Sequence, residues 1–121
     1  IKVSREAVAA NGSLDFSFSY TKNDRVMTVC VELKNAHHPK IDHGINTQLP
    51  LYINDIGNKE GIFFVLWYKC DAYAKPKSFS SLGHMRGHLT GEIPDGYNIR
   101  ILIADCSKKL PPSNPARKLG E

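Results

Sequence analysis

Two acids and a lysine in the first third of the chain have the types and spacing of a divalent-cation site. Glu32 and Lys34 are separated by one residue at the end of an alternating apolar segment, and Asp15 lies in an earlier alternating segment. Carboxylate oxygens suit Mg²⁺ or Mn²⁺, and a nearby ammonium can orient a water or stabilise charge developing on a phosphate. This chemistry requires that the fold bring the three side chains together.

A predicted β-hairpin brings Asp15 next to Glu32. Residues 14–21 and 26–34 both alternate between apolar and polar side chains, which is typical of strands with one buried face. If the turn between them is centred on Asn23-Asp24, Asp15 faces Glu32 across the hairpin, with Cβ atoms roughly 4.5–5.5 Å apart. Lys34 then points to the same face as Glu32.

A second predicted hairpin adds a third carboxylate. Asn11-Gly12 is typical of a type I′ turn, and with these two residues at the turn Glu6 pairs with Ser17, diagonal to Asp15. The opposite face, with the apolar residues of 14–20, is the predicted core. Like charges this close repel, so we expect a divalent cation to neutralise them. The alternative is a solvent-facing sheet surface with ordinary mixed charges.

A predicted helix over 43–56 follows the three-stranded meander. Apolar residues recur there at spacings of three and four, with Asp42 as the expected N-cap and Gly57 as the residue after the C-terminus. Pro50 lies inside this helix, so we expect a kink or a restart at that position.

The remaining segments predict an α/β fold. The apolar run 61–70 is typical of a strand buried on both faces, and 97–106 predicts another strand. Between them, Gly83 and Gly87 weaken a possible helix, so we expect residues 71–96 to be only half ordered. The predicted order is β-β-β-α-β-(α)-β, a central mixed sheet flanked by helices.

Composition indicates one globular domain, expected over residues 1–106, with a basic, proline-containing tail over 107–121. The chain has 121 residues, of which 41% are hydrophobic and 23% charged, and a net charge of +4. The longest apolar run is far shorter than the roughly 20 residues of a membrane span, which favours a cytoplasmic protein without membrane contact. Because the chain does not begin with Met, we expect a fragment or a processed form. A homodimer or a larger parent protein is compatible with this sequence.

Isolated thiols and histidines give weaker signals. Cys30, Cys70 and Cys106 form no C-x-x-C pair, so we expect reduced thiols. His84 and His88 are four residues apart, a spacing that can hold zinc on a helix, but the sequence offers no evident third ligand. We therefore do not predict a zinc site.

Three segments together resemble a known nuclease superfamily. GSLDFSF at 12–18, VCVELKN at 29–35 and QLPLYI at 48–53 are similar to motifs of the PD-(D/E)xK, restriction-endonuclease-like superfamily. The similarity is to its branch with a Q-x-x-x-Y helix motif, as in RecB-type nuclease domains, and extends over about residues 3–106. Leu14 stands where the family name has Pro, and the family's leading helix is absent.

The resemblance implies a metal-dependent nuclease that hydrolyses phosphodiester bonds of DNA, or of RNA, through a metal-bound water. Asp15 and Glu32 would hold Mg²⁺ or Mn²⁺ with the backbone carbonyl of Leu33, and Lys34 would assist the attacking water. The alternative is a non-catalytic nucleic-acid-binding or protein-interaction module on the same fold. A nucleotide- or sugar-binding domain ranks lower, because the sequence lacks a Gly-rich phosphate loop.

The same resemblance assigns supporting residues. Gln48 and Tyr52, one helical turn apart, would align the active site or contact the nucleic-acid strand. Glu6 would substitute for the acid that some members carry on the leading helix, although an ordinary exposed strand residue is an equal alternative.

Overall fold

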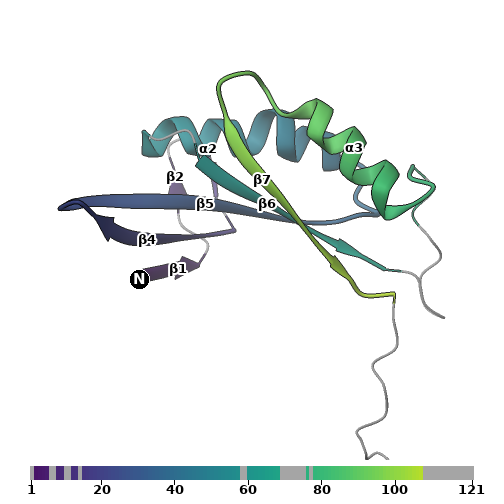
Figure 1. Ribbon diagram of the computed structural model, residues 1–121, viewed down its shortest axis with the longest axis horizontal. Helices are drawn as coiled ribbons and strands as arrows, with labels where there is room; N and C mark the ends of the chain where they lie inside the picture. Colours follow the sequence, from purple (N-terminus) through teal and green to yellow (C-terminus); the bar gives the residue numbers. More distant parts are fainter. Residues whose placement is uncertain are drawn as a thin grey trace, which may run out of the picture.

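The chain folds around a mixed five-stranded sheet (Figure 1). The computed structural model describes residues 2–5, 8–9, 12–13, 15–57, 60–68, 76 and 78–107. Among these, the strands of the sheet follow the order β1 (Lys2–Arg5), β4 (Phe16–Lys22), β5 (Arg25–Asn35), β6 (Glu60–Trp67) and β7 (Asn98–Asp105). A separate ribbon contains β2 (Val8–Ala9) and β3 (Gly12–Ser13). The first three strands of the sheet pair antiparallel and the last two continue in parallel, so the predicted α/β class is confirmed.

Helices connect the parallel strands. One helical run joins β5 to β6 and comprises α1 (Ile41–His43), the π-helical segment η1 (Gly44–Gln48) and α2 (Leu49–Ile56). Helix α3 (Leu82–Glu92) lies between β6 and β7 in the chain. Figure 1 shows α2 and α3 over the same face of the sheet. Two successive crossovers of the same hand, progressing in one direction, place their helices on the same face.

The core lies between that face and the helices. Alternate residues of β6 are buried, including Phe63 at 0% exposure and Trp67 at 4%. They pack with apolar residues of both helical segments, among which Ile45, Leu49, Ile53, Met85 and Leu89 are each 0% exposed.

The predicted core face of the amino-terminal strands is buried only in part: Val29 and Val31 on that face are buried, but the helix-covered core lies on the other face. Ser17 is buried and pairs with the core residue Cys30, whereas Phe16 and Phe18 are half-buried on the opposite face. Strand β6 is likewise fully buried on one face only, because Phe64 and its alternate neighbours are half-buried. The side on which the helices lie is determined by crossover handedness, which the polarity of β4 does not reveal.

The hairpin between β4 and β5 has the predicted register. Lys22 pairs with Arg25, and the two turn residues, Asn23 and Asp24, have φ angles of 54° and 63°. Two positive φ angles are typical of a type I′ turn. The ladder ends at the pairing of Phe16 with Val31, so Asp15 and Glu32 are the next residues on the two sides of the hairpin.

The register of the first hairpin differs from the prediction by two residues. Ser4, not Glu6, pairs with Ser17, and Gly12 pairs with Ala9 instead of lying in the turn. A slip of two residues leaves every side chain on the same face, so the alternation could not distinguish the two registers. Glu6 lies outside the described residues.

The helical run changes from π-helical to α-helical one residue before Pro50, where a kink or a restart is predicted, and the backbone stays helical on both sides of the change. The π-helical segment η1 ends two residues before this proline, which occupies the first turn of α2 and cannot donate a backbone hydrogen bond. Gly57 ends the run with φ of 93°, and its N–H donates to the Ile53 carbonyl at 3.0 Å. The predicted N-cap was wrong, because Lys40 occupies that position and Asp42 lies in the first turn.

Helix α3 spans 11 residues of the segment 71–96, for which a helix weakened by two glycines is predicted; residues 71–75 and 77 lie outside the described residues. The Ser81 hydroxyl caps it by accepting from the His84 N–H at 3.1 Å, and Met85 and Leu89 are fully buried. The cap and the packing offset the cost of Gly83 and Gly87, both exposed.

Two other expectations concern thiols and membrane contact. Cys30 and Cys106 are free, and burial, with a smaller contribution from the charge of Asp55, raises the pKa of the Cys30 thiol to about 11. Cys70 and residues 108–121 of the predicted tail lie outside the described residues. In the described part of the chain, every helix falls short of the length and apolarity that crossing a membrane requires.

Candidate metal centre at the ends of strands β4 and β5

Asp15 is fixed beside β5 by the backbone of the facing strand. Its Oδ2 accepts a hydrogen bond of 2.7 Å from the Leu33 N–H. The N–H and C=O groups of one strand residue point to the same side, so the Leu33 carbonyl also faces the β4 side of β5. The backbone oxygen expected to assist a metal therefore lies on the side of Asp15.

Glu32 is a buried carboxyl group whose charge is disfavoured. It is 5% exposed, and burial, followed by the charge of Asp15, raises its pKa to about 7. The positive charge and hydrogen bond of Lys34 oppose this shift only in part. Glu32 Oε1 is buried and has no hydrogen-bond partner among the described residues. This oxygen has lost its water without gaining a donor, which is costly for a carboxylate.

Lys34 is held close to Glu32 by the helical run above it. Its Nζ lies 3.4 Å from Glu32 Oε2, and its side chain is only 13% exposed. Gly44 makes this placement possible, because a Cβ at that position would lie 2.9 Å from Lys34 Cε and 3.0 Å from Phe63 Cε1. The approach of η1 to the sheet at Gly44 thus confines the lysine.

The helical run carries two more predicted site residues, Gln48 and Tyr52, of which Tyr52 lies near the same carboxylates. Gln48 Oε1 is a second buried oxygen without a hydrogen-bond partner in the described part of the chain. Tyr52 is 6% exposed, and burial, with the negative charges of Glu32 and Asp15, raises the pKa of its hydroxyl. The electrostatic influence of both acids places this hydroxyl in their vicinity.

Four of the predicted site residues therefore lie around one end of the β4–β5 hairpin and form what we call the β4–β5 cluster. They are Asp15, Glu32, Lys34 and Tyr52. Gln48 lies four residues before Tyr52 on the same helical run. The backbone of Leu33 joins them, whereas Glu6 is outside the described residues. The catalytic roles of these residues stay predictions.

Sequence reasoning did not single out Gly44 and gave no functional role to His38, a second residue beside this cluster. Gly44, which admits the lysine, could have been suspected only from its place in a helix that packs on a strand. Burial and the positive charges of Lys34 and Lys40 lower the pKa of His38, so this exposed loop histidine lies within the electrostatic reach of Lys34. Neither residue belongs to a recognisable motif.

A comparison with protein families gives one match. A family model described as Domain of unknown function (DUF8371) matches residues 1–70, more than half of the chain. The chain belongs to this family. The match includes the four clustered residues and Gln48, and extends through β6. No curated protein and no solved structure matches the chain.

Proposed function

We propose that this DUF8371 chain is a metal-dependent nuclease that hydrolyses phosphodiester bonds of DNA or RNA with Mg²⁺ or Mn²⁺. One observation carries the proposal. Glu32 is buried beside Asp15, and one of its carboxylate oxygens has no donor among the described residues. Such a pair calls for a cation, and Lys34 supplies a single positive charge against two carboxylates.

The donor set fits a hard divalent cation. Asp15 and Glu32 would hold the ion through carboxylate oxygens, and the Leu33 carbonyl faces the same side of β5. Ligands made only of oxygen favour Mg²⁺ or Mn²⁺ over softer metals. When bound, the ion would supply Lewis-acid activation of water and stabilisation of charge on the phosphate.

The chain's own groups would position the reactants. The Lys34 ammonium, confined between Glu32 and Gly44, would orient the attacking water or stabilise charge on the phosphate. Gln48 and Tyr52 would support the site from the helical run. Because the pKa of Glu32 is about 7, protons compete with the cation, and we expect cleavage to increase as the pH rises through 7.

The fold supports the same proposal at a coarser level. An antiparallel meander followed by two parallel strands, each reached through a helical connection, agrees with the central mixed sheet expected of restriction-endonuclease-like domains. Within that arrangement the acids lie at the end of the second and third strands of the sheet. A specific restriction-endonuclease-like topology is part of the proposal.

A cleavage assay on labelled single- and double-stranded DNA and RNA tests this function. Each substrate is incubated with Mg²⁺, with Mn²⁺ and with a chelator, using the wild type, Asp15→Asn and Asp24→Asn. The second variant is a matched control, because it makes the same change at the exposed far end of the same hairpin. Its left-handed φ of 63° also suits asparagine.

We expect metal-dependent cleavage by the wild type and the control, and a loss of about 10²-fold or more in Asp15→Asn. Cleavage that persists in chelator, or an active Asp15→Asn variant, would overturn the assignment. Salt-sensitive binding without any cleavage would instead identify a non-catalytic nucleic-acid-binding module.

A further inference from the structure

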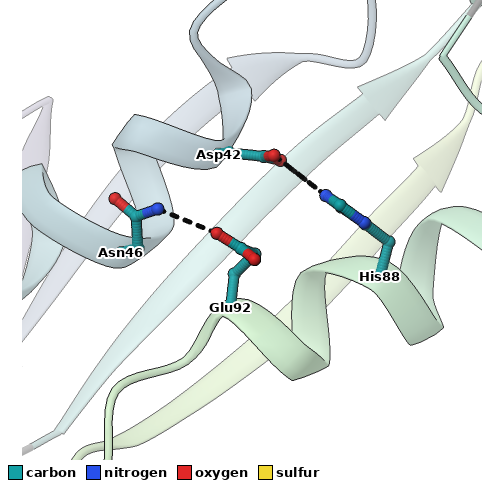
Figure 2. Close-up of polar contacts among 4 residues, drawn as sticks. All are labelled: Asp42, Asn46, His88 and Glu92. Atoms are coloured by element: carbon teal, nitrogen blue, oxygen red, sulfur yellow. Dashed lines mark hydrogen bonds and ion pairs between the residues drawn. The ribbon is translucent and has the colours of Figure 1, made fainter.

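A second cluster of potential metal ligands lies between the start of the helical run and α3. Figure 2 shows Asp42 and Asn46 on one helix facing His88 and Glu92 on the other. His88 Nε2 lies 3.0 Å and 2.9 Å from the two carboxylate oxygens of Asp42. One ligand atom each from Asp42, His88 and Glu92 lie within 4.8 Å of one another.

Helical spacing and docking together create this cluster. His88 and Glu92 are four residues apart on α3, and Asp42 and Asn46 have the same spacing on the facing run. Residues four apart lie on one face of a helix, so each helix presents two polar side chains to the other. Asn46 Nδ2 donates to Glu92 Oε1 at 2.8 Å, which orients this carboxylate and leaves its second oxygen for another ligand.

We propose that Asp42, His88 and Glu92 bind a zinc ion. An imidazole with two carboxylates is a ligand set that zinc uses, and the imidazole favours zinc over Mg²⁺. The side chains of His88 and Asp42 are 38% and 45% exposed, so water can complete the coordination. The proposal involves none of the residues of the β4–β5 cluster and does not depend on the proposed nuclease function.

Only small movements separate the observed arrangement from coordination. Ligand atoms around tetrahedral zinc lie roughly 3.4 Å apart, as follows from bonds of about 2.1 Å. The distance of 2.9 Å between His88 Nε2 and Asp42 Oδ2 would increase slightly as zinc replaces the proton of Nε2. The Phe79 ring lies 5.6 Å from the His88 ring, centroid to centroid, and restricts its rotation.

Bound zinc would connect α3 to the helical run that carries Gln48 and Tyr52. Because zinc would bind the folded chain through groups that unfolding separates, it should stabilise the fold by mass action. Asn46 acts in this scheme as a positioning residue, since it touches Glu92 and not the ion.

Calorimetric titration of the full chain with Zn²⁺ tests the proposal. Absorption spectra with Co²⁺ as a probe provide a second readout that reports coordination by the imidazole. The variants are His88→Ala and Glu92→Gln, with His84→Ala as the matched control. His84 lies one turn earlier on α3 and also contacts the Phe79 ring, but is not part of the cluster. Asp15→Asn removes a ligand of the other cluster and so separates metal binding there from metal binding here.

We expect one zinc at this cluster, besides any zinc taken up by the β4–β5 cluster, and an affinity reduced at least about tenfold in His88→Ala and Glu92→Gln, since even outer-shell changes at metal sites cost about 10–100-fold. His84→Ala should bind as the wild type does, and Asp15→Asn should keep the zinc of this cluster. The Co²⁺ absorption that depends on the imidazole should be lost only in His88→Ala and weakened only in Glu92→Gln. Absence of zinc binding by the wild type would overturn the proposal. So would unchanged affinity in both ligand variants, which would place the ion elsewhere.

Discussion

The two clusters of ionisable side chains have similar acids but opposite environments. At the end of β4 and β5, Glu32 is 5% exposed and one of its oxygens lacks a partner among the described residues. Between α1 and α3, the side chains of Asp42 and His88 remain about two-fifths exposed and satisfy each other. Burial of Glu32 therefore makes the first cluster unfavourable for folding when no cation is bound. The second cluster does not oppose folding in the absence of a cation.

This difference changes what each cluster does to the fold. An unneutralised buried carboxylate opposes folding, but a solvated ion pair contributes little in either direction. A substitution that removes the charge of Glu32 should accordingly raise the free energy of unfolding. A substitution that removes the charge of Asp42 should lower it slightly. The sign of the effect is the sharpest test of the comparison.

The largest effect on stability is expected from Glu32→Gln. The folded-state pKa of about 7 exceeds the ordinary value of 4.5, so the protonated carboxyl favours the folded state. Its stabilising contribution is fully present below pH 4.5 and is lost as the pH rises through 7. At pH 8 and without metal, the variant should therefore be more stable than the wild type by up to about 3 kcal/mol.

Urea denaturation in chelator at pH 4.5 and pH 8 measures this difference. The gap between Glu32→Gln and the wild type should open only at the higher pH, and Mg²⁺ should narrow it by stabilising the wild type alone. Glu92→Gln, the same change in the other cluster, is the control. If the free energies of unfolding of the wild type and Glu32→Gln changed with pH in parallel, burial of the charged Glu32 carboxylate would not destabilise the fold.

Smaller changes in stability are expected from glycine-to-alanine substitutions beside the two clusters, a decrease at one position and an increase at the other. At Gly44 the new methyl group would lie 2.9 Å from Lys34 Cε and 3.0 Å from Phe63 Cε1. Such overpacking typically costs about 1–3 kcal/mol, more than the roughly 1 kcal/mol gained in helix propensity. Gly44→Ala should therefore destabilise the chain and displace the Lys34 amine, lowering any metal-dependent cleavage.

Gly87→Ala is the matched comparison on α3. A Cβ there would meet nothing within 4 Å, so only the propensity gain of up to about 1 kcal/mol remains. Chemical denaturation of both variants measures the contrast. Equal stabilisation by both changes would mean that the chain relaxes freely around Gly44.

The proximity of Asp15 and Glu32 could be predicted from the sequence because one local feature, the turn at Asn23-Asp24, determines it. Asn23-Asp24 suits two positive φ angles, and once the turn is placed, period-two alternation brings Asp15 to Glu32. The first hairpin lacked such a constraint, because a shift of two residues preserves every face. The predicted register of the first hairpin was therefore wrong by two residues.

Features that depend on docking could not be read from the sequence. The face covered by the helices is a property of crossover geometry, and the alternation in 14–20 indicated the opposite face as core. The Asp42, His88 and Glu92 cluster likewise requires knowing how α3 lies against the helical run. The His84 and His88 spacing drew attention to the right helix, but the partners of His88 come from one turn later and from a segment 46 positions earlier.

The smallest contribution to stability is expected from the interaction between Asp42 and His88. Without metal, a double-mutant cycle with Asp42→Ala and His88→Ala should give a coupling of about 0.2–1 kcal/mol, as exposed ion pairs do. Stability is measured by urea denaturation in chelator. A coupling well above 1 kcal/mol would mean that this exposed pair resembles the buried cluster after all, and the contrast between the two regions would be lost.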